Sequence, residues 1–168
     1  MQPTVPEFAD LLRALNDQSV RCVVIGGLAM ILHGSSYVTF DLDIAVSTDG
    51  SNTLPIIQAL APLHPFPPQF GSADNFVWEE RSIFGAVISL VTDAGLVDIL
   101  RVQPGIDSFE GLWQRSEVRE VAGLKVRVAS ITDLIAMKRA AGRPKDLDHI
   151  KQLEALKALQ PGAIGSDS

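Results

Sequence analysis

The chain has 168 residues, of which 46% are hydrophobic, so we expect one packed domain. It contains no apolar run of the roughly 18 residues that a membrane-spanning helix needs, so we expect no membrane association. Its formal net charge of −6 argues against a general nucleic-acid-binding surface, which usually needs a clear basic excess. The single cysteine, Cys22, excludes an internal disulfide, and together with the absence of a signal pattern at the start it predicts a cytoplasmic protein.

The N-terminal half is predicted to alternate helices and strands. Thr4 and Glu7 have the spacing of a capping box, which predicts a helix that starts near residue 4 and ends at residues 16–18. Residues 20–25 read as a buried strand, and Gly26-Gly27 turns this strand into a short helix over 28–33. A second strand over 42–46 and an amphipathic helix over 52–63 follow.

The C-terminal half is predicted to add hairpins and two long helices. A proline-rich loop at 62–75 is followed by strands at 76–80, 86–92 and 95–102, a helix at 107–115 and a hairpin over 117–130. Ser130 and Asp133 open a helix that runs to Ala141, and a last helix spans about 145–159. This order predicts an α/β (α+β) fold with a mixed sheet flanked by helices, in one domain over residues 1–160 with a flexible tail over 161–168.

Two aspartates interrupt the apolar strand at 42–46. Because side chains alternate between the faces of a strand, Asp41 and Asp43 project from one face while Leu42 and Ile44 enter the core. Two neighbouring carboxylates repel unless a cation lies between them, and Mg²⁺ prefers such oxygen ligands. The alternative is structural: Asp41 caps the preceding turn and Asp43 lies on a hydrated face of the sheet.

Two further features favour a catalytic site. The turn at Gly26-Gly27 exposes backbone N–H groups at the start of a helix, where phosphate binds readily, although it is also explained as a tight strand-to-helix turn. Asp98 interrupts an otherwise apolar strand and is costly there unless it is partnered or faces a cleft. Three carboxylates on adjacent strands would hold metal for phosphoryl or nucleotidyl transfer.

Lys138 and Asp146 are predicted to point inward from neighbouring helices. At 100° per residue, Lys138 falls within the apolar stripe of its helix, and Asp146 falls within the stripe set by Leu147, Ile150 and Leu153. This placement fits a structural salt bridge or a lysine that meets a phosphate, and the sequence leaves both readings open.

The charge distribution is compatible with a two-walled site. Residues 1–100 contain three basic and eleven acidic groups, a balance of −8, whereas residues 101–168 contain eleven basic and nine acidic groups, a balance of +2. Such a division suits a site that holds cations on one wall and phosphates on the other, although on this observation alone uneven surface charge without a function is the favoured explanation.

Taken together, Gly26-Gly27, His33-Gly34, the stretch Thr39-x-Asp41-Leu-Asp43 and the segment over 134–150 resemble the nucleotidyltransferase superfamily with the DNA polymerase beta-type fold. The resemblance is greatest to small bacterial members, the toxin-type and antibiotic-modifying transferases. Asp98 fits the third acidic position of their pattern. Tyr37 departs from it, since small members often carry a basic residue there.

The resemblance implies transfer of a nucleoside monophosphate from a nucleoside triphosphate such as ATP to a hydroxyl acceptor, with Mg²⁺ or Mn²⁺. Asp41 and Asp43 would ligate the metal, Asp98 would ligate metal or act as general base, and Gly26, Gly27 and Lys138 would approach the phosphates. The alternative is a non-catalytic binding module, such as one component of a toxin–antitoxin pair that meets a cognate antitoxin. Modification of tRNA is a third reading, which a basic cleft built from Lys138, Arg139, Arg143 and Lys145 would favour.

Overall fold

The computed structural model describes residues 8–160, so the expected helix start at Thr4 and Glu7 and the tail over 161–168 lie outside the described residues. A six-stranded sheet forms the centre, in the order β3-β4-β2-β1-β6-β5. The strands are β1 (Cys22–Ile25), β2 (Asp41–Val46), β3 (Val87–Thr92), β4 (Gly95–Leu100), β5 (Glu117–Val121) and β6 (Leu124–Val128).

The sheet is mixed, as the element order predicted. β2 pairs antiparallel with β1 and parallel with β4, and β1 pairs parallel with β6. β3–β4 and β5–β6 are antiparallel hairpins. β2 therefore lies between the two strands that carry the other candidate site features of the sequence, the Gly26-Gly27 turn after β1 and Asp98 in β4.

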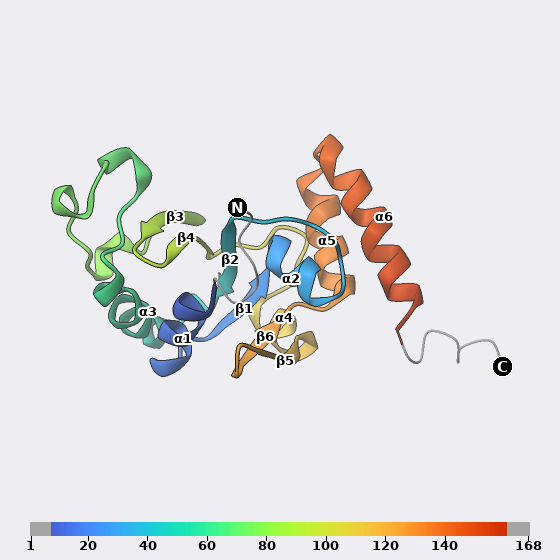
Figure 1. Ribbon diagram of the computed structural model, residues 1–168, viewed down its shortest axis with the longest axis horizontal. Coiled ribbons are helices and arrows are strands. Elements are labelled where there is room, and N and C mark those ends of the chain that lie inside the picture. Colours follow the sequence, from blue (N-terminus) through green and yellow to red (C-terminus); the bar gives the residue numbers. More distant parts are fainter. Residues whose placement is uncertain (1–7, 161–168) are drawn as a thin grey trace.

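Helices flank the sheet on both sides (Figure 1), with α1 and α3 grouped on one side and α2, α5 and α6 on the other. They are α1 (Ala9–Asp17), α2 (Gly26–Leu32), α3 (Thr53–Leu60), α4 (Phe109–Arg115), α5 (Ile131–Ala141) and α6 (Pro144–Ala158). Short 3-10 turns are η2 (Gly50–Asn52), η3 (Ala61–Leu63), η4 (Pro68–Phe70), η5 (Ala73–Asn75) and η6 (Glu80–Ser82). No described helix has the length and apolar character that a membrane crossing requires.

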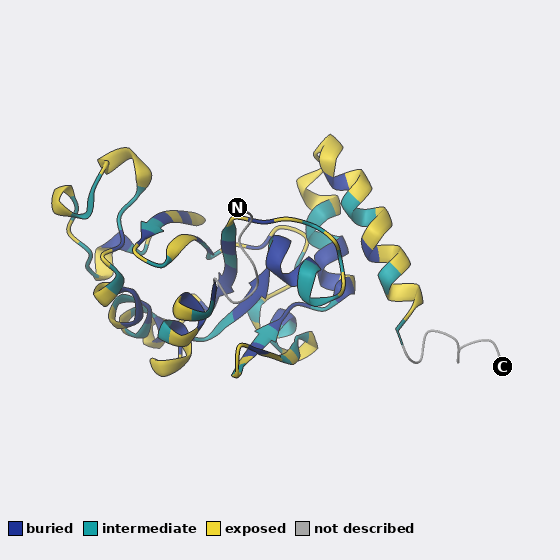
Figure 2. Ribbon diagram, viewed as in Figure 1, coloured by how far each residue is buried: buried dark blue, intermediate teal, exposed yellow. Residues whose placement is uncertain are grey.

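The core lies where the central strands meet α1, α2 and α3. Leu42 and Ile44 of β2 and Leu28 of α2 are fully buried, as the alternation of β2 predicted. Figure 2 shows that burial concentrates in the central strands and α2, whereas α6 is mostly exposed. Within α6 only Asp146 and Leu153 are buried. The predicted burial of Leu147 is wrong, because this residue is 64% exposed.

The strand predicted at 76–80 is also wrong. Residues 76–79 form no strand, and the chain turns into η6 because Glu79 and Ser82 exchange hydrogen bonds. The indole N–H of Trp78 donates to the carbonyl oxygen of Ile57 at 2.9 Å, which fixes this loop against α3. Trp78 of this segment therefore lies against α3, while Val77 is exposed, and β3 begins only at Val87.

The two edges of the sheet differ. At the β3 edge, Phe66 from the proline-rich loop exchanges both backbone hydrogen bonds with Val91, at 3.0 and 2.8 Å. The β5 edge carries alternating charges, with Glu117, Arg119 and Glu120 in a five-residue strand.

Candidate active site

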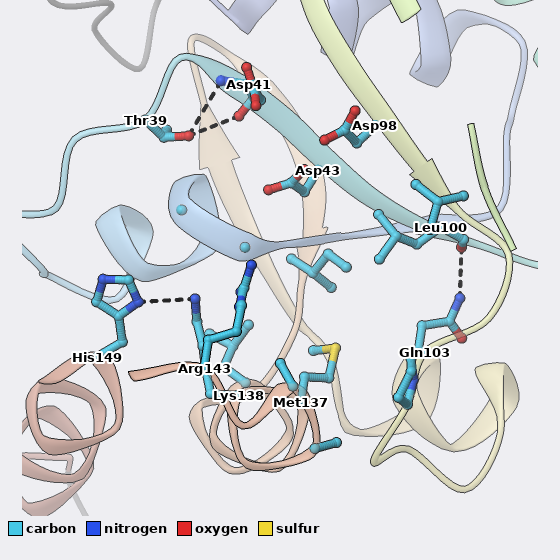
Figure 3. A pocket seen from close by; sticks show the side chains of 18 of the residues that line it. Thr39, Asp41, Asp43, Asp98, Leu100, Gln103, Met137, Lys138, Arg143 and His149 are labelled. Carbon is cyan, nitrogen blue, oxygen red and sulfur yellow. Dashed lines mark hydrogen bonds between the residues drawn. The ribbon is translucent and has the colours of Figure 1, made fainter. Parts of the chain in front are cut away.

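The parallel pairing of β2 with β4 brings the three sequence-predicted carboxylates to one place. Asp43 lies directly opposite Asp98 in the register of these strands, and Asp41 lies opposite Leu96 two residues earlier. All three aspartates line one cavity, while their neighbour Leu42 faces the opposite side of the sheet and is fully buried. Figure 3 shows the three side chains gathered above the start of α2.

The carboxylates are close enough to affect one another's ionisation. Burial, followed by the negative charge of Asp98, raises the pKa of Asp43 to about 7. Burial, followed by the charge of Asp98, also raises the pKa of Asp41. This half-buried cluster therefore holds more negative charge than its surroundings compensate.

The cavity that the aspartates line has a volume of about 460 Å³ and three chemically distinct walls. The acidic wall is formed by Asp41, Asp43 and Asp98. Opposite it, α5 and the start of α6 contribute the basic wall, formed by Lys138, Arg143, Lys145 and His149. The remaining wall is mostly apolar and includes Val87, Leu100, Gln103, Pro104, Leu134, Met137, Ala140 and Ala141.

The glycine pair lies at the floor of the cavity, where each glycine makes room for a functional side chain. Gly26 has φ +65°, and a Cβ placed on it would overlap the carboxylate of Asp43. A Cβ on Gly27 would come within 2.7 Å of the Cβ of Thr39 and of the ring of Tyr37. The sequence predicted that these glycines approach phosphates, and the structure gives them a further role, which is to let β2 and the residues before it lie close to α2.

The basic wall is organised by an ion-paired cluster between α5 and α6. Lys138 Nζ lies 3.5 Å from Asp146 Oδ1, so the predicted salt bridge is present. Arg143, at the N-cap of α6, makes a two-pronged contact with the same carboxylate, at 2.9 Å from Nε and 3.2 Å from Nη2. Lys138 also lies 3.1 Å from Nδ1 of His149, whose ring meets the ring of Tyr37 edge-on at 4.8 Å.

The sequence placed Lys138 at the site, named Arg143 and Lys145 only as parts of a basic cleft that would suit tRNA, and noted Tyr37 only as a departure from the family pattern. The contribution of His149 was missed. In the structure Tyr37, Arg143, Lys145 and His149 all line the same cavity as Lys138. Arg139, which the sequence grouped with these cations, instead pairs with Glu154 at 2.9 Å and does not line the cavity.

A family profile supplies the identification. The family described as "Nucleotidyltransferase of unknown function (DUF6036)" matches residues 4–162. The chain belongs to this nucleotidyltransferase family. No curated protein sequence matches the chain.

Solved structures of similar shape confirm the fold of this nucleotidyltransferase family member. The lincosamide antibiotic adenylyltransferase LnuA, solved with lincomycin, has 18% identity and a TM-score of 0.60, over 93% of this chain and 99% of that one. ANT(2'')-Ia, solved with adenylyl-2''-tobramycin, has 17% identity and a TM-score of 0.58, over 95% and 90%. A nucleotidyltransferase-like protein from Paracoccidioides brasiliensis has 16% identity and a TM-score of 0.53, over 96% and 80%. At these identities the likeness concerns the α/β nucleotidyltransferase fold alone.

The nucleotidyltransferase fold raises the question of whether this site suits a divalent cation. Among residues 8–160, no three acidic, histidine or cysteine side chains are arranged as a ready-made metal centre. The donor chemistry nevertheless fits, because Asp41, Asp43 and Asp98 line one cavity and the charge of Asp98 contributes to the raised pKa of Asp43, a repulsion that a bound cation would relieve. Asp41, Asp43 and Asp98 are the residues that would hold the ion.

Proposed function

We propose that this nucleotidyltransferase transfers a nucleoside monophosphate from a nucleoside triphosphate to a hydroxyl group of an acceptor. The observation that carries the proposal is the direct pairing of Asp43 with Asp98 in a cavity whose opposite wall is basic. An acidic wall suits a metal ion and an acceptor hydroxyl, and a basic wall suits the phosphates that leave.

In the proposed reaction each wall has a distinct task. The hydroxyl oxygen of the acceptor forms a bond to the α-phosphorus, and the bond from that phosphorus to the oxygen bridging to the β-phosphorus breaks, which releases pyrophosphate. Asp98 accepts the hydroxyl proton, for which its place beside Asp43 on β4 is suitable. Lys138 and Arg143 bind the β- and γ-phosphates, which leave as negatively charged pyrophosphate. A bound Mg²⁺ or Mn²⁺ would supply electrostatic stabilisation of the transferring phosphoryl group.

The apolar wall is the place where the acceptor would lie. The proposed acceptor class is therefore a hydroxyl-bearing molecule with some apolar surface, which could contact Val87, Leu100 and Met137 while its hydroxyl meets the aspartates. Two antibiotic-modifying enzymes share the fold, but their identities of 18% and 17% do not extend their acceptors to this chain.

A label-transfer assay tests the proposal. Purified protein is mixed with Mg²⁺, each α-labelled nucleoside triphosphate in turn and an extract of small molecules and RNA, and transfer of label to a new species is measured. We expect transfer by the natural protein and a loss of at least about 10²-fold with Asp43→Asn or Asp98→Asn. Asp93→Asn is the matched control, because Asp93 is exposed in the β3–β4 turn and pairs with His64 outside the cavity. Equal transfer by Asp43→Asn and Asp93→Asn would refute the proposal.

A further inference from the structure

Asp146 is a buried charge that lies behind the basic wall of the cavity. Its side chain is 1% exposed, and it does not itself line the cavity that Asp41, Asp43 and Asp98 share. Burying a carboxylate costs free energy unless charged or polar groups compensate it, so the residues that contact Asp146 must offset this cost. Both of its cationic partners, Lys138 and Arg143, line the cavity.

The contacts of Asp146 fix the directions of these two cations. Its Oδ2 accepts from Nε of Arg143 at 2.9 Å and from the backbone N–H of the same residue at 3.1 Å, while Oδ1 accepts from Nη2 at 3.2 Å. Lys138 Nζ approaches Oδ1 at 3.5 Å. A two-pronged arginine–carboxylate contact restricts the orientation of the guanidinium plane. Arg143 is thus held by its backbone and by two side-chain nitrogens, although its side chain is 53% exposed.

Lys138 is held from a second direction as well. Its Nζ donates to Nδ1 of His149 at 3.1 Å, and the ring of His149 is supported edge-on by Tyr37. The side chain of Lys138 is only 15% exposed, and burial lowers its pKa while the nearby carboxylate of Asp146 opposes that decrease. Asp146 therefore offsets part of the cost of burying the positive charge of Lys138.

Tyr37 supplies no positive charge to the cavity, so the cations must come from other residues. Tyr37 lines the cavity beside the glycine pair but carries no positive charge at neutral pH. Positive charge on this side of the cavity comes instead from the helix pair α5–α6, through Lys138, Arg143 and Lys145. Figure 3 shows Lys138 and Arg143 extending from these helices toward the side of Asp43.

We propose that Asp146 is a positioning residue, which holds Arg143 and Lys138 in the orientation that binds the pyrophosphate portion of the nucleotide. This inference rests on the proposed function, because it assigns the basic wall to the donor phosphates. Asp146 touches no substrate in this arrangement and acts through the two cations.

Asp133 provides a matched control within the same helix pair. It is 5% exposed, belongs to α5 and accepts two hydrogen bonds from Nε of Arg115, at 2.9 and 3.1 Å. Neither Asp133 nor Arg115 lines the cavity. Asp133→Asn therefore removes a comparable buried carboxylate–arginine pair without altering the basic wall, and both variants are expected to unfold at a lower temperature than the natural protein.

The direct test measures binding of inorganic pyrophosphate with Mg²⁺ by isothermal titration calorimetry. Asp146→Asn should weaken the affinity for pyrophosphate about tenfold, because two charge-assisted contacts lose their alignment. Asp133→Asn should bind as the natural protein does, and Asp146→Glu, which keeps the carboxylate, should recover part of the affinity. In the label-transfer assay, Asp146→Asn should raise KM for the triphosphate about tenfold, with a smaller change in kcat.

The outcomes separate this inference from the proposed function. Equal pyrophosphate affinity in Asp146→Asn and Asp133→Asn, or no pyrophosphate binding by the natural protein, would overturn the positioning role. Label transfer with unchanged KM in Asp146→Asn would overturn it too, while leaving the proposed function intact. Pyrophosphate binding that depends on Asp146, without label transfer to any acceptor, would support the positioning role and count against the proposed function.

Discussion

Gly26 and Asp43 show how a backbone position can determine the geometry of a candidate catalytic side chain. The carboxylate of Asp43 occupies the space that a Cβ on residue 26 would fill, and Gly26 also has a positive φ of +65°. Both features disfavour any other residue at position 26. A Cβ there would overlap the carboxylate of Asp43, and the left-handed backbone conformation costs a residue with a side chain about 1–2 kcal/mol. The glycine therefore serves the aspartate as much as any phosphate.

Gly26→Ala is predicted to abolish label transfer and to lower the free energy of unfolding by more than about 2 kcal/mol, because the new methyl group displaces Asp43 as well as straining the backbone. Urea denaturation and the transfer assay measure the two effects. Gly71→Ala is the control, since Gly71 has φ +78° but open space around its Cβ position. A Gly26→Ala protein as active as Gly71→Ala would contradict this account.

Asp146 predicts a specific dependence of stability on pH. A hydrogen bond from Arg143 lowers the pKa of Asp146 to about 2, below its ordinary value of 3.8. Because the folded-state pKa is depressed, this carboxylate stabilises the fold above about pH 4, and its contribution of about 2 kcal/mol is lost as the pH falls toward 2. The difference in melting temperature between the natural protein and Asp146→Asn should therefore shrink over that interval. A difference that stays constant from pH 6 to pH 2.5 would exclude Asp146 as its source.

The helix α6 packs along α5 but buries few of its side chains. It buries only Asp146 and Leu153, and its remaining contacts with the rest of the described chain come from partly buried residues such as Ile150 and Leu156. By contrast, Val23, Val24 and Ile25 of β1 are all buried at the centre of the sheet. The basic wall is thus built partly on one of the least buried elements of the molecule.

Native-state hydrogen exchange is predicted to show this difference between elements. Amides of α6 should exchange through local opening, with lower protection than amides of β1 and β2, which exchange only through global unfolding. Addition of Mg²⁺ and ATP should increase the protection of α6 if its N-terminal residues bind phosphate. Protection of α6 equal to that of β1 in the free protein would show that the helix is more firmly anchored than its burial indicates.

The outcome of sequence prediction also differed by element. Asp41, Asp43 and Asp98 could be singled out because each is a charge in an apolar strand, and the alternation of β2 correctly separated them from Leu42. Their meeting depends on the register of β2 against β4, which pairs residues 55 positions apart and is not encoded locally. His149 was missed, and Arg143 was named only as part of a cleft for tRNA, because the packing of α6 on α5 decides which cavity these side chains line. The failed strand at 76–80 reflects the local hydrogen bonds of Glu79 and Ser82, which outweighed its apolar composition.

At the scale of the whole molecule, the acidic and basic walls come from different parts of the chain. The acidic wall lies on β2 and β4, within residues 1–100, whereas Lys138, Arg143 and Lys145 belong to the C-terminal part. The uneven distribution of charge along the sequence therefore corresponds to two sides of one cavity. A ligand that bridges the two walls would stabilise the fold as a whole, because it would bind only the folded chain.

Thermal unfolding with Mg²⁺ and ATP tests this linkage. At a ligand concentration a hundred times Kd, we expect stabilisation by about 2.7 kcal/mol and an increase in melting temperature of about 5–10 °C. Removal of Mg²⁺ with EDTA should reverse most of the increase, and Asp43→Asn should show a smaller one because it has lost a ligand of the ion. A melting temperature that Mg²⁺ and ATP leave unchanged would contradict a two-walled nucleotide site.

The way in which the two edge strands of the sheet are covered or charged affects the tendency of the protein to aggregate at high concentration. An exposed edge strand offers unpaired N–H and C=O groups to another molecule, which is a common route to aggregation. Here Phe66 occupies part of the β3 edge, and the charges of Glu117, Arg119 and Glu120 make the β5 edge unfavourable for a second strand. Growth of the sheet from one molecule into the next is therefore opposed at both ends, by backbone pairing at one and by charged, hydrated side chains at the other.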